Sequence, residues 1–458
     1  MTISKSLAVV ILAAGQGTRM RSSKPKVLHE LAGRPLLQHV IDVAQALDPK
    51  EIVVVIGHGA EQVRQAISAN NIRWVVQEEQ LGTGHAVKIA LPKVDSDNVL
   101  VLYGDVPLIR SKTLQPVIQG LEGRAINLLT VDLEDPTGYG RIVRNTIGEV
   151  EKIVEHRDAS DEILQLKEGN TGILCASRLD LAGYLAEVGS NNSQGELYLT
   201  DCIELCIAAQ GQVRGIKAED VWQVSGVNDK PQLNKLERRF QQNKAQEIME
   251  NGVTLADKKR FDLRGELKTG QDVFIDINCL FSGDVQLGDD VSIGPNCCIH
   301  NSSLGNGVEV LANTVIDNAT IEAHCSLGPF TRIRPETTMK QGSKAGNFVE
   351  IKKSVVGEGS KVNHLSYIGD AKLGKNVNVG AGTITCNYDG ANKHLTDVGD
   401  NVFIGSNSAL VAPVVLEEGS TIGAGSTITK KAPKEKLTLE RSRQITMDNW
   451  QRPTKGEN

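Results

Sequence analysis

A glycine-rich loop near the N-terminus carries two cationic side chains at a spacing suited to binding phosphate. The apolar run Leu7–Leu12 leads into Leu12-Ala13-Ala14-Gly15-Gln16-Gly17-Thr18-Arg19-Met20, and Lys24-Pro25-Lys26 follows. Glycines let backbone N–H groups approach an anion closely, and Arg19 and Lys26 can neutralise charge on a triphosphate. The loop lacks the Gly-Lys-Ser/Thr of a Walker loop and the third glycine of a dinucleotide fingerprint. It predicts a nucleotide-phosphate loop, the alternative being a tight strand-to-helix turn.

A glutamine amide stands at the start of a second polar loop, after the strand-like run Trp74–Val76. The loop reads Gln77-Glu78-Glu79-Gln80-Leu81-Gly82-Thr83-Gly84-His85-Ala86. The donor and acceptor of the Gln77 amide suit N3–H and O4 of uracil, but the flipped amide suits cytosine. The choice of base would therefore rest on backbone groups around Gly82 and Thr83, whose polarity cannot flip. We expect His85 to be structural rather than a base, and simple turn glycines are the alternative interpretation of the loop.

A carboxylate follows directly after a third apolar run. The segment Leu100-Val101-Leu102-Tyr103-Gly104-Asp105 places Asp105 at the end of a buried strand. Mg²⁺ prefers one or two carboxylates together with phosphate oxygens and water, so Asp105 is a candidate ligand. The alternative is an Asp that caps the next helix. Ligands of open α/β sheets bind beyond the carboxyl ends of the strands, which is where these three loops are expected to lie.

Together these motifs resemble the signature of the sugar-nucleotide pyrophosphorylases. The resemblance implies that Arg19 and Lys26 are catalytic and that Asp105 and Asn228 hold Mg²⁺. It implies a UDP-sugar site formed by Leu12, Ala13, Ala14, Gly15, Lys26, Gln77, Gly82, Thr83, Tyr103, Gly104, Asp105, Gly140, Glu155, Asn170 and Asn228. Within that set, Gly140, Glu155 and Asn170 would contact the hexosamine, whose hydroxyl and acetamido groups need both donors and acceptors.

The composition favours a protein that acts on small molecules. The chain has 458 residues and a formal net charge of −6. This charge gives no basic surface for nucleic acid, and we expect neither a nucleic-acid partner nor membrane insertion. The eight cysteines show no paired CxxC spacing, which argues against a zinc site or a disulfide framework. The opening apolar run is too short for a membrane span and passes into the phosphate loop, so we expect a cytoplasmic protein without a signal peptide.

Short apolar runs alternate with helical segments through the first half of the chain. This alternation predicts a mostly parallel sheet covered by helices, and we assign residues 1–228 to an α/β, Rossmann-like nucleotidyltransferase domain. Residues 229–250 are strongly charged, with apolar residues at helical spacing, and predict a linker helix. The expected strands are Leu7–Leu12, Ile52–Ile56, Trp74–Val76, Val99–Leu102 and Ile126–Val131, and Leu36–Leu47 is an expected helix.

A six-residue repeat dominates residues 251–458. This period excludes a helix, is too long for strand alternation, and predicts a parallel β-helix whose interior is filled by the recurring apolar residues. Breaks at Lys344–Ser354 and Thr383–His394 predict two inserted loops on one face, often the binding face. The recurring residues are Leu287, Ile293, Ile299; Ile321, Leu327, Ile333; Val356, Val362, Ile368; and Ile404, Leu410, Leu416, Ile422, Ile428.

The repeat resembles the hexapeptide acyltransferases, which implies a left-handed β-helix, and the chain from Leu7 to Arg441 resembles one bifunctional family. Members of that family acetylate glucosamine 1-phosphate with acetyl-CoA. They then transfer UMP from UTP to the product, which yields UDP-N-acetylglucosamine for cell-envelope precursors such as peptidoglycan and lipopolysaccharide. The resemblance implies a homotrimer and two ligand sets. For glucosamine 1-phosphate these are Arg334, Lys352, Tyr367, Asn378 and Lys393, and for acetyl-CoA they are Ala381, Asn387, Tyr388, Ser406, Ala424 and Arg441.

Acetyl transfer requires a base, because an amine attacks a thioester only when it is neutral. His364 is the natural candidate, since histidine titrates near neutral pH. Glu350 could orient its ring, and Asn387 could stabilise the oxyanion. Two alternatives stay open. One is a monofunctional sugar-nucleotide pyrophosphorylase with a regulatory β-helix, and the other is a non-enzymatic relative, which would be expected to lack Arg19, Lys26 and Asp105.

Overall fold

The computed structural model describes residues 6–121 and 123–452, and the chain divides into two compact units. The first unit is Met1–Phe240 and the second is Gln241–Asn458, so the division falls inside helix α8 (Lys230–Glu250). Leu236, in the first half of α8, is buried in a cluster of the first unit. Ile248, near its end, belongs to the core of the second unit. Each unit therefore takes part of the helix into its own core.

One mostly parallel sheet forms the centre of the first unit. Its strands run in the order β11-β7-β10-β6-β1-β4-β5, with β8 and β9 attached beside β10. β10 is antiparallel to both of its neighbours, β6 and β7, an exception that the strand pattern did not predict. The strands are β1 (Leu7–Ala13), β4 (Glu51–Ile56), β5 (Ile72–Val76), β6 (Asn98–Tyr103), β7 (Ala125–Asp132), β8 (Arg141–Arg144), β9 (Val150–Val154), β10 (Glu168–Ser177) and β11 (Gln212–Lys217); β2 (Glu30–Leu31) and β3 (Arg34–Pro35) form a separate hairpin. The Rossmann-like architecture is confirmed.

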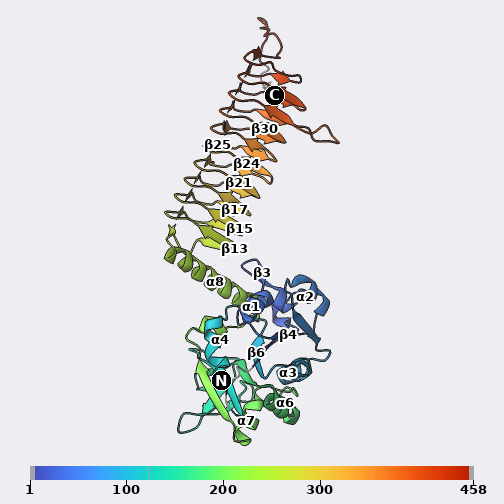
Figure 1. Ribbon diagram of the computed structural model, residues 1–458, viewed down its shortest axis with the longest axis vertical. Helices are drawn as coiled ribbons and strands as arrows, with labels where there is room; N and C mark the ends of the chain where they lie inside the picture. The colour runs from blue at the N-terminus through green and yellow to red at the C-terminus, as the bar shows by residue number, and fades with distance from the viewer. Residues whose placement is uncertain (1–5, 122, 453–458) are drawn as a thin grey trace, which may run out of the picture. The chain divides into compact units, whose positions relative to one another are not determined.

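Helices cover both faces of this sheet (Figure 1). Successive residues of β1 point to opposite faces, so Val9 and Ile11 pack with one helical layer and Ala8 and Val10 with the other. The first layer contains α1 (Leu36–Gln45), α2 (Ala60–Ala66) and α4 (Ser111–Ile118), and the second contains α3 (Thr83–Ala90), α6 (Arg178–Glu187) and α7 (Asp201–Ala208). The short α5 (Asp161–Leu164) follows β9. Because both faces are covered, the strands read as continuous apolar runs.

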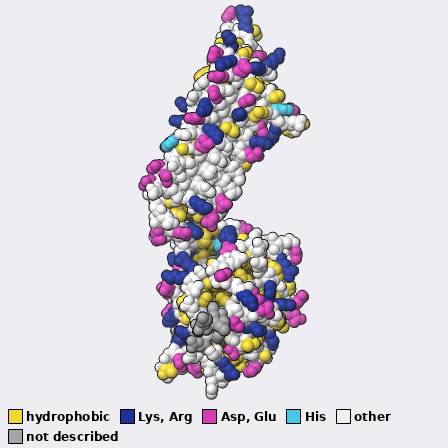
Figure 2. Space-filling model, in the orientation of Figure 1, with side chains coloured by type: hydrophobic (Ala, Val, Ile, Leu, Met, Phe, Trp, Pro, Cys, Tyr) yellow, Lys and Arg dark blue, Asp and Glu magenta, His cyan; other side chains and the backbone are white. Residues whose placement is uncertain are grey.

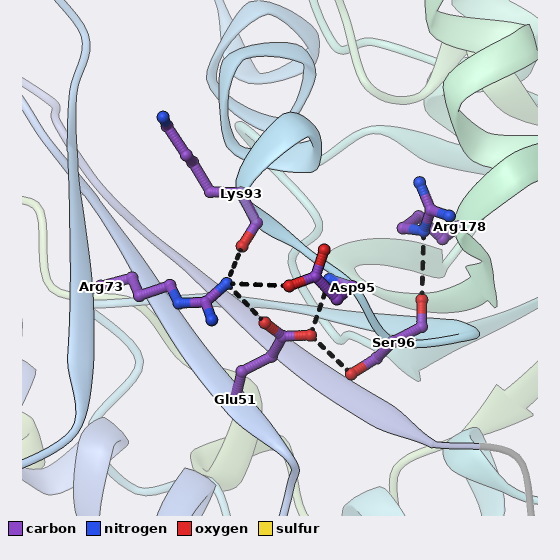
Figure 3. Close-up of polar contacts among 6 residues, drawn as sticks. All are labelled: Glu51, Arg73, Lys93, Asp95, Ser96 and Arg178. Carbon is purple, nitrogen blue, oxygen red and sulfur yellow. Dashed lines mark hydrogen bonds and ion pairs between the residues drawn. The ribbon is translucent and has the colours of Figure 1, made fainter.

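A buried carboxylate ties the amino ends of the strands together. Glu51, at the start of β4, is 8% exposed. One of its oxygens accepts from the backbone N–H of Asp95 at 2.8 Å and from the hydroxyl of Ser96 at 2.7 Å, and the other accepts from Arg73 at 2.9 Å (Figure 3). Arg73 also donates to the Lys93 carbonyl at 2.6 Å. This network fixes the turn that leads into β6, at the opposite end of the strands from the polar loops.

The second unit is a left-handed parallel β-helix with three columns of strands. All of the pairings between coils are parallel and join each strand to the one in the next coil. One column is β12 (Thr254–Leu255), β14 (Phe274–Ile275), β16 (Ser292–Ile293), β19 (Glu309–Val310), β22 (Ser326–Leu327), β25 (Lys344–Asn347), β28 (Lys361–His364), β31 (Asn378–Val379), β34 (Phe403–Ile404), β37 (Thr421–Ile422) and β39 (Leu437–Thr438).

The other two columns belong to one continuous sheet. The long strands β13 (Phe261–Thr269) and β15 (Cys279–Leu287) begin it, because each passes through a corner of the prism. The second column continues with β17 (Cys298–His300), β20 (Val315–Asp317), β23 (Arg332–Ile333), β26 (Glu350–Lys352), β29 (Tyr367–Gly369), β32 (Ile384–Cys386), β35 (Ala409–Val411) and β38 (Thr427–Ile428). The third continues with β18 (Ser303–Leu304), β21 (Ala319–Ile321), β24 (Thr337–Met339), β27 (Val355–Val356), β30 (Ala371–Leu373), β33 (Thr396–Val398) and β36 (Val414–Leu416).

The recurring apolar residues fill the interior of this prism, as predicted, and all of them belong to one core cluster. The inserted loop predicted at Lys344–Ser354 is wrong. This segment contains the regular strands β25 and β26, which pair with the coils before and after them. The repeat is hidden there because the interior position is taken by the small Ala345, and the step from Ile351 to Val356 is five residues rather than six.

The second predicted insertion is present. Val362 pairs with Val379, 17 residues further on, whereas Val379 pairs with Ile404, 25 residues further on. The additional residues lie between the end of β32 at Cys386 and the start of β33 at Thr396, where the chain leaves the prism and returns (Figure 1). The loop therefore starts after Cys386 rather than at Thr383.

The Glu51 network makes a prediction about stability. Glu51→Ala leaves the buried Ser96 hydroxyl and the Asp95 N–H without their acceptor, and we expect it to lower the unfolding free energy of the first unit by about 2–4 kcal/mol. Urea unfolding followed by tryptophan fluorescence measures this, since Trp74 lies beside Arg73 on β5. Glu61→Ala is the matched control, because Glu61 is exposed on α2 and accepts a hydrogen bond from Gln65 at 2.9 Å, one turn along the same helix. Equal midpoints for the two variants would contradict the structural role of Glu51.

Candidate active sites

A cavity of about 550 Å³ opens where β1 and β6 end. The two strands are parallel, with Leu12 opposite Tyr103, so they deliver their loops to the same edge of the sheet. The volume falls in the usual range of small-molecule sites. Residues of all three polar loops line the cavity: Leu12, Ala13, Ala14, Gly15, Gln16, Lys26, Val27, Gln77, Gln80, Gly82, Thr83, Ala86, Tyr103, Asp105 and Glu196.

One ammonium group lies between the two predicted metal ligands. Lys26 Nζ forms an ion pair with the Asp105 carboxylate and donates to Asn228 Oδ1 at 3.0 Å. Arg19 donates to the same Asn228 oxygen at 2.9 Å. The segment before Asn228 is held in place because the Val227 N–H donates to the Asp105 carbonyl at 2.9 Å. Two oxygen ligands that are distant in the sequence thus converge on one cation position.

The backbone around Gly17 allows Lys26 to reach this position. Gly17 has φ 65°, and a Cβ at this residue would lie 2.6 Å from the Cβ of Lys26. Lys26 begins the short 3₁₀ helix η2 (Lys26–Leu28), whose next two residues are buried. The glycine is therefore required both by its left-handed conformation and by the close approach of the lysine.

Gln77 is buried and its amide nitrogen has two protein partners. It donates to the Gly82 carbonyl at 3.2 Å and lies 3.0 Å from Nδ1 of His85. The loop that carries Gly82 is itself bonded to a distant segment, since the Leu197 N–H donates to Leu81 at 2.8 Å and the Gly84 N–H donates to Leu197 at 2.8 Å. This backbone pairing supports the loop at the back of the cavity.

The residues predicted to contact the sugar lie beside this cavity rather than in it. Tyr103 lines both that cavity and a smaller one, which Asn170 and Thr200 also line. The Asn170 N–H donates to the Gly140 carbonyl at 2.8 Å. Glu155 accepts from the Thr200 hydroxyl at 3.2 Å, and burial raises the pKa of its carboxyl group. The structure thus brings Gly140, Glu155 and Asn170 together on the far side of Tyr103.

Several lining residues were not among the predicted ones. Gln16 and Gln80 come from different loops and are joined across the cavity by a hydrogen bond of 2.9 Å. Gln16 stands within the glycine-rich motif, but its side chain gave no separate signal. Glu196 reaches the cavity from beyond β10, and only tertiary structure reveals this. Gly104, which was predicted, does not line the cavity; its N–H donates to Leu12 at 2.9 Å.

Three cationic side chains gather at the second column of the β-helix. Ile333 pairs with Ile351, so Arg334 and Lys352 lie in adjacent coils at the same level. The nearby ammonium of Lys393, in the inserted loop, and then the charge of Arg334 lower the pKa of Lys352. Glu350 accepts from Arg334 at 2.7 Å. The described residues include no contact between Glu350 and His364, so the orientation of the His364 ring by Glu350 stays a prediction.

Most of the predicted acetyl-CoA residues stack in a line above His364. Lys361 pairs with Asn378 and Val362 with Val379, a register that places Ala381 one coil beyond His364. The next two coils continue this line with Ser406 and Ala424, as the registers of the following strands indicate. Arg441 donates to the Ala424 carbonyl at 3.1 Å. Coils are spaced by about 4.8 Å, so the line suits a long, narrow ligand.

The remaining predicted residues lie around the inserted loop and on the first column. Asn387 is buried at the start of the loop and donates to the Asp370 carboxylate. Tyr388 is 60% exposed, and its hydroxyl donates to the Gly390 carbonyl at 2.6 Å. Tyr367 pairs with Glu350 in the second column, whereas Asn378 lies on β31 in the first. These groups thus lie on two different columns of the prism and on the inserted loop.

Charged side chains of both signs are mixed over the visible face of the first unit (Figure 2). Within residues 6–121 and 123–452, no helix is long and apolar enough to cross a membrane. On the face in view, positive and negative side chains are thus interspersed and form no broad patch of a single sign.

Comparisons with known proteins match both units. Residues 9–171 match the MobA-like NTP transferase domain, residues 267–301 the bacterial transferase hexapeptide repeat, and residues 396–430 the hexapeptide repeat of succinyl-transferase. The chain is 53% identical to the bifunctional protein GlmU of Marinobacter nauticus, over 98% of this chain and 99% of that one. It is 53% identical to the GlmU of Stutzerimonas stutzeri, over 98% and 100%, and 50% identical to that of Acinetobacter baumannii, over 98% and 99%.

The fold and both matches define a nucleotidyltransferase joined to a hexapeptide-repeat acyltransferase. The relatives match along nearly their whole length, so each of them contains both the nucleotidyltransferase half and the hexapeptide-repeat half. The chain belongs to the family of bifunctional GlmU proteins. It is a uridylyltransferase and an acetyltransferase of UDP-N-acetylglucosamine synthesis, and the monofunctional alternative is not supported.

The position of Asp105 leads to a prediction about uridylyl transfer. Asp105→Ala removes the carboxylate that is paired with Lys26, and we expect uridylyl transfer to fall at least about 100-fold, because metal stabilisation of phosphoryl charge is worth several kcal/mol. Pyrophosphate release measures it. Asp132→Ala is the control, since Asp132 forms an exposed ion pair with Lys217. Acetyl transfer should be normal in both variants, and an unchanged rate of pyrophosphate release in Asp105→Ala would refute the assignment.

Proposed function

We propose that the cavity at the ends of β1 and β6 binds UTP and that the smaller cavity beyond Tyr103 receives the N-acetylglucosamine part of the sugar phosphate. The convergence of Lys26, Asp105 and Asn228 beside the glycine-rich loop is the observation that carries this proposal. These groups lie where the phosphates would sit, between the base loop and the sugar residues. The sugar phosphate then attacks the α-phosphorus of UTP directly and displaces pyrophosphate.

Asp105 and Asn228 would hold Mg²⁺ in this reaction. Within the described part of the chain, no three His, Cys, Asp or Glu side chains come together as a metal centre. One carboxylate and one amide oxygen around a single cation position nevertheless fit Mg²⁺, which takes its other ligands from phosphate and water. When bound, the ion would compensate negative charge on the phosphate oxygens.

Lys26 and Arg19 act on the same phosphates. Lys26 is bonded to Asp105 and Asn228, and Arg19 is bonded to Asn228. A triphosphate offers them a more strongly charged partner, and their transfer to it frees the two oxygen ligands. The cations then stabilise the charge that develops on the α-phosphate and on the departing pyrophosphate. The cations that these contacts hold beside the cavity would thus be its catalytic groups.

The C-terminal site would bind glucosamine 1-phosphate through Arg334, Lys352 and Lys393. The ammonium of Lys393 and the charge of Arg334 lower the pKa of Lys352, and a phosphate dianion would stabilise this group of cations, which supports this assignment. Acetyl-CoA would lie along the line from Ala381 to Arg441, with its thioester toward His364. His364 then takes a proton from the amine as it attacks the thioester carbonyl, and coenzyme A leaves as the thiol. Asn387 would contribute a donor to the oxyanion through the N–H that Asp370 does not use.

A homotrimer would complete this second site. Phe330 and Phe348 stack on each other with ring centroids 5.3 Å apart, yet they are 51% and 58% exposed. Both have φ 56°, and Leu365, beside His364, follows them with φ 50° and 63% exposure. Large apolar residues in the left-handed region are strained, and exposing them costs more. A neighbouring copy packed on this column would bury it and enclose His364.

The two activities act in series on one sugar. The acetylated product of the C-terminal site is the acceptor for UMP at the N-terminal site, and both donors, acetyl-CoA and UTP, are metabolites of the cytoplasm. We therefore place the protein in the cytoplasm.

The assignment of His364 is tested by supplying two substrate mixtures. His364→Ala should lower acetyl transfer by about 10²–10⁴-fold, the usual contribution of a general base. It should fail with glucosamine 1-phosphate, acetyl-CoA and UTP, but form UDP-N-acetylglucosamine normally from pre-acetylated sugar phosphate and UTP. His324→Ala, another exposed histidine of the β-helix, should behave as the wild type in both. If His364→Ala succeeds in both mixtures, the histidine is structural.

The apolar column provides a test of the trimer. The double variant Phe330→Asn and Phe348→Asn removes the apolar surface while relieving backbone strain, because asparagine tolerates the left-handed conformation and already occupies it at Asn313. We expect light scattering to show a smaller assembly and acetyl transfer to fall at least tenfold. Uridylyl transfer should be unchanged. A full-size trimer with normal acetyl transfer would show that this column is not the interface.

A further inference from the structure

The amide of Gln77 is held in one orientation by two groups of the protein. Its nitrogen lies 3.2 Å from the Gly82 carbonyl and 3.0 Å from Nδ1 of His85. A carbonyl oxygen can only accept, so the group facing Gly82 must be the NH₂ end of the amide. His85 Nδ1 must then also accept, which places the ring proton on Nε2. Both N–H groups of Gln77 are committed to the protein.

The oxygen of the same amide is left for the ligand. No group in the described part of the chain is hydrogen-bonded to Gln77 Oε1, and Gln77 lines the nucleotide cavity. A base at this position therefore meets an acceptor. Uracil carries N3–H, which can donate to it, whereas cytosine carries an unprotonated N3, whose lone pair would face the oxygen. The orientation of the amide thus distinguishes the two pyrimidines.

From this geometry we propose that His85 is a positioning residue for base selection: its neutral ring, protonated on Nε2, holds the Gln77 amide so that Oε1 faces the base, which favours UTP over CTP. The inference rests on the proposed binding of UTP in this cavity. His85 acts only through Gln77 and does not contact the reacting phosphates.

The surrounding structure keeps the two partners of Gln77 in fixed positions. His85 lies in the first turn of α3, and Gly82 immediately precedes that helix. Gly82 has φ 105°, and a Cβ there would lie 2.6 Å from the Leu197 carbonyl oxygen, so the loop is packed tightly against the segment around Leu197. The Leu199 N–H donates to the Thr83 hydroxyl at 3.2 Å. Helix α3 and the loop before it are bonded to the same segment. The two acceptors of the Gln77 amide, the Gly82 carbonyl and His85 Nδ1, are therefore held in place whichever nucleotide binds.

The Gly82 carbonyl and His85 Nδ1 each favour the same orientation of the amide. If His85 loses its acceptor, the Gly82 carbonyl still favours the same orientation, so the selection should weaken rather than disappear. One hydrogen bond of the ordinary net strength corresponds to about a tenfold preference. Part of the protein would then carry the flipped amide, whose NH₂ group can donate to N3 of cytosine. Transfer from CTP should therefore become faster, while transfer from UTP becomes slower.

The test compares uridylyl and cytidylyl transfer by variants at His85 in the full-length enzyme. His85→Phe keeps a ring but has no acceptor, and His85→Asn offers Oδ1 near the position of Nδ1. We expect His85→Phe to lower the ratio of kcat/KM for UTP to that for CTP about tenfold, with the rate for CTP rising. His85→Asn should restore most of the ratio. An unchanged ratio, an equal loss for both nucleotides, or a His85→Asn variant no better than His85→Phe would overturn the proposal.

A spectroscopic measurement on the unmodified protein tests it independently of folding in the variants. The ¹⁵N chemical shifts of the His85 ring should show a proton on Nε2 and an accepting Nδ1. A proton on Nδ1 would overturn the inference. A wild-type enzyme that forms no UDP-sugar would instead refute the proposed function, so the two failures are distinguishable.

Discussion

Parallel pairing of strands is the constraint on which both sites depend. In the first unit it brings the carboxyl ends of β1 and β6 to the same edge, so that loops separated by some ninety residues of sequence meet around one cavity. In the second unit it repeats the same turn in successive coils, and residues at equivalent positions form lines along the prism. One pairing rule thus produces a compact pocket in one unit and an extended surface in the other. The difference follows from the connections, which are helices in the first case and short turns in the second.

Both proposed sites contain cations that are paired with carboxylates of the same chain. Lys26 is paired with Asp105 at the proposed nucleotide site, and Arg334 is paired with Glu350 at the proposed acetyl-transfer site. Such pairs keep flexible cationic side chains in place without a ligand, while a phosphate can still displace the carboxylate because it carries more charge and more acceptor atoms. Lys352 differs, because the facing ammonium of Lys393 lowers its pKa while the Asp370 carboxylate acts in the opposite direction.

The column of Phe330, Phe348 and Leu365 conflicts with the local preferences of the fold. Equivalent turns elsewhere carry asparagine or glycine, as at Asn313 and Gly382, which adopt the left-handed conformation at little cost. Three large apolar residues that are both exposed and in this conformation raise the free energy of the folded single chain. Sites where local rules are broken without a gain inside the chain point to interactions outside it.

The sequence by itself determined the class of each unit, the activities of the family and most of the residues that line the cavity of the first unit. Alternating apolar runs and a six-residue period are local signals, and Arg19, Lys26, Gln77 and Asp105 stand in contiguous motifs at strand ends. Tertiary structure decided what depends on atoms brought together from distant segments. The antiparallel β10, the regular coil hidden by Ala345, and the pairing of Glu350 with Arg334 are of this kind. So is the orientation of the Gln77 amide: the sequence left its donor and acceptor interchangeable, because only the carbonyl of Gly82 and the ring of His85, placed by the fold, distinguish one end of an amide from the other.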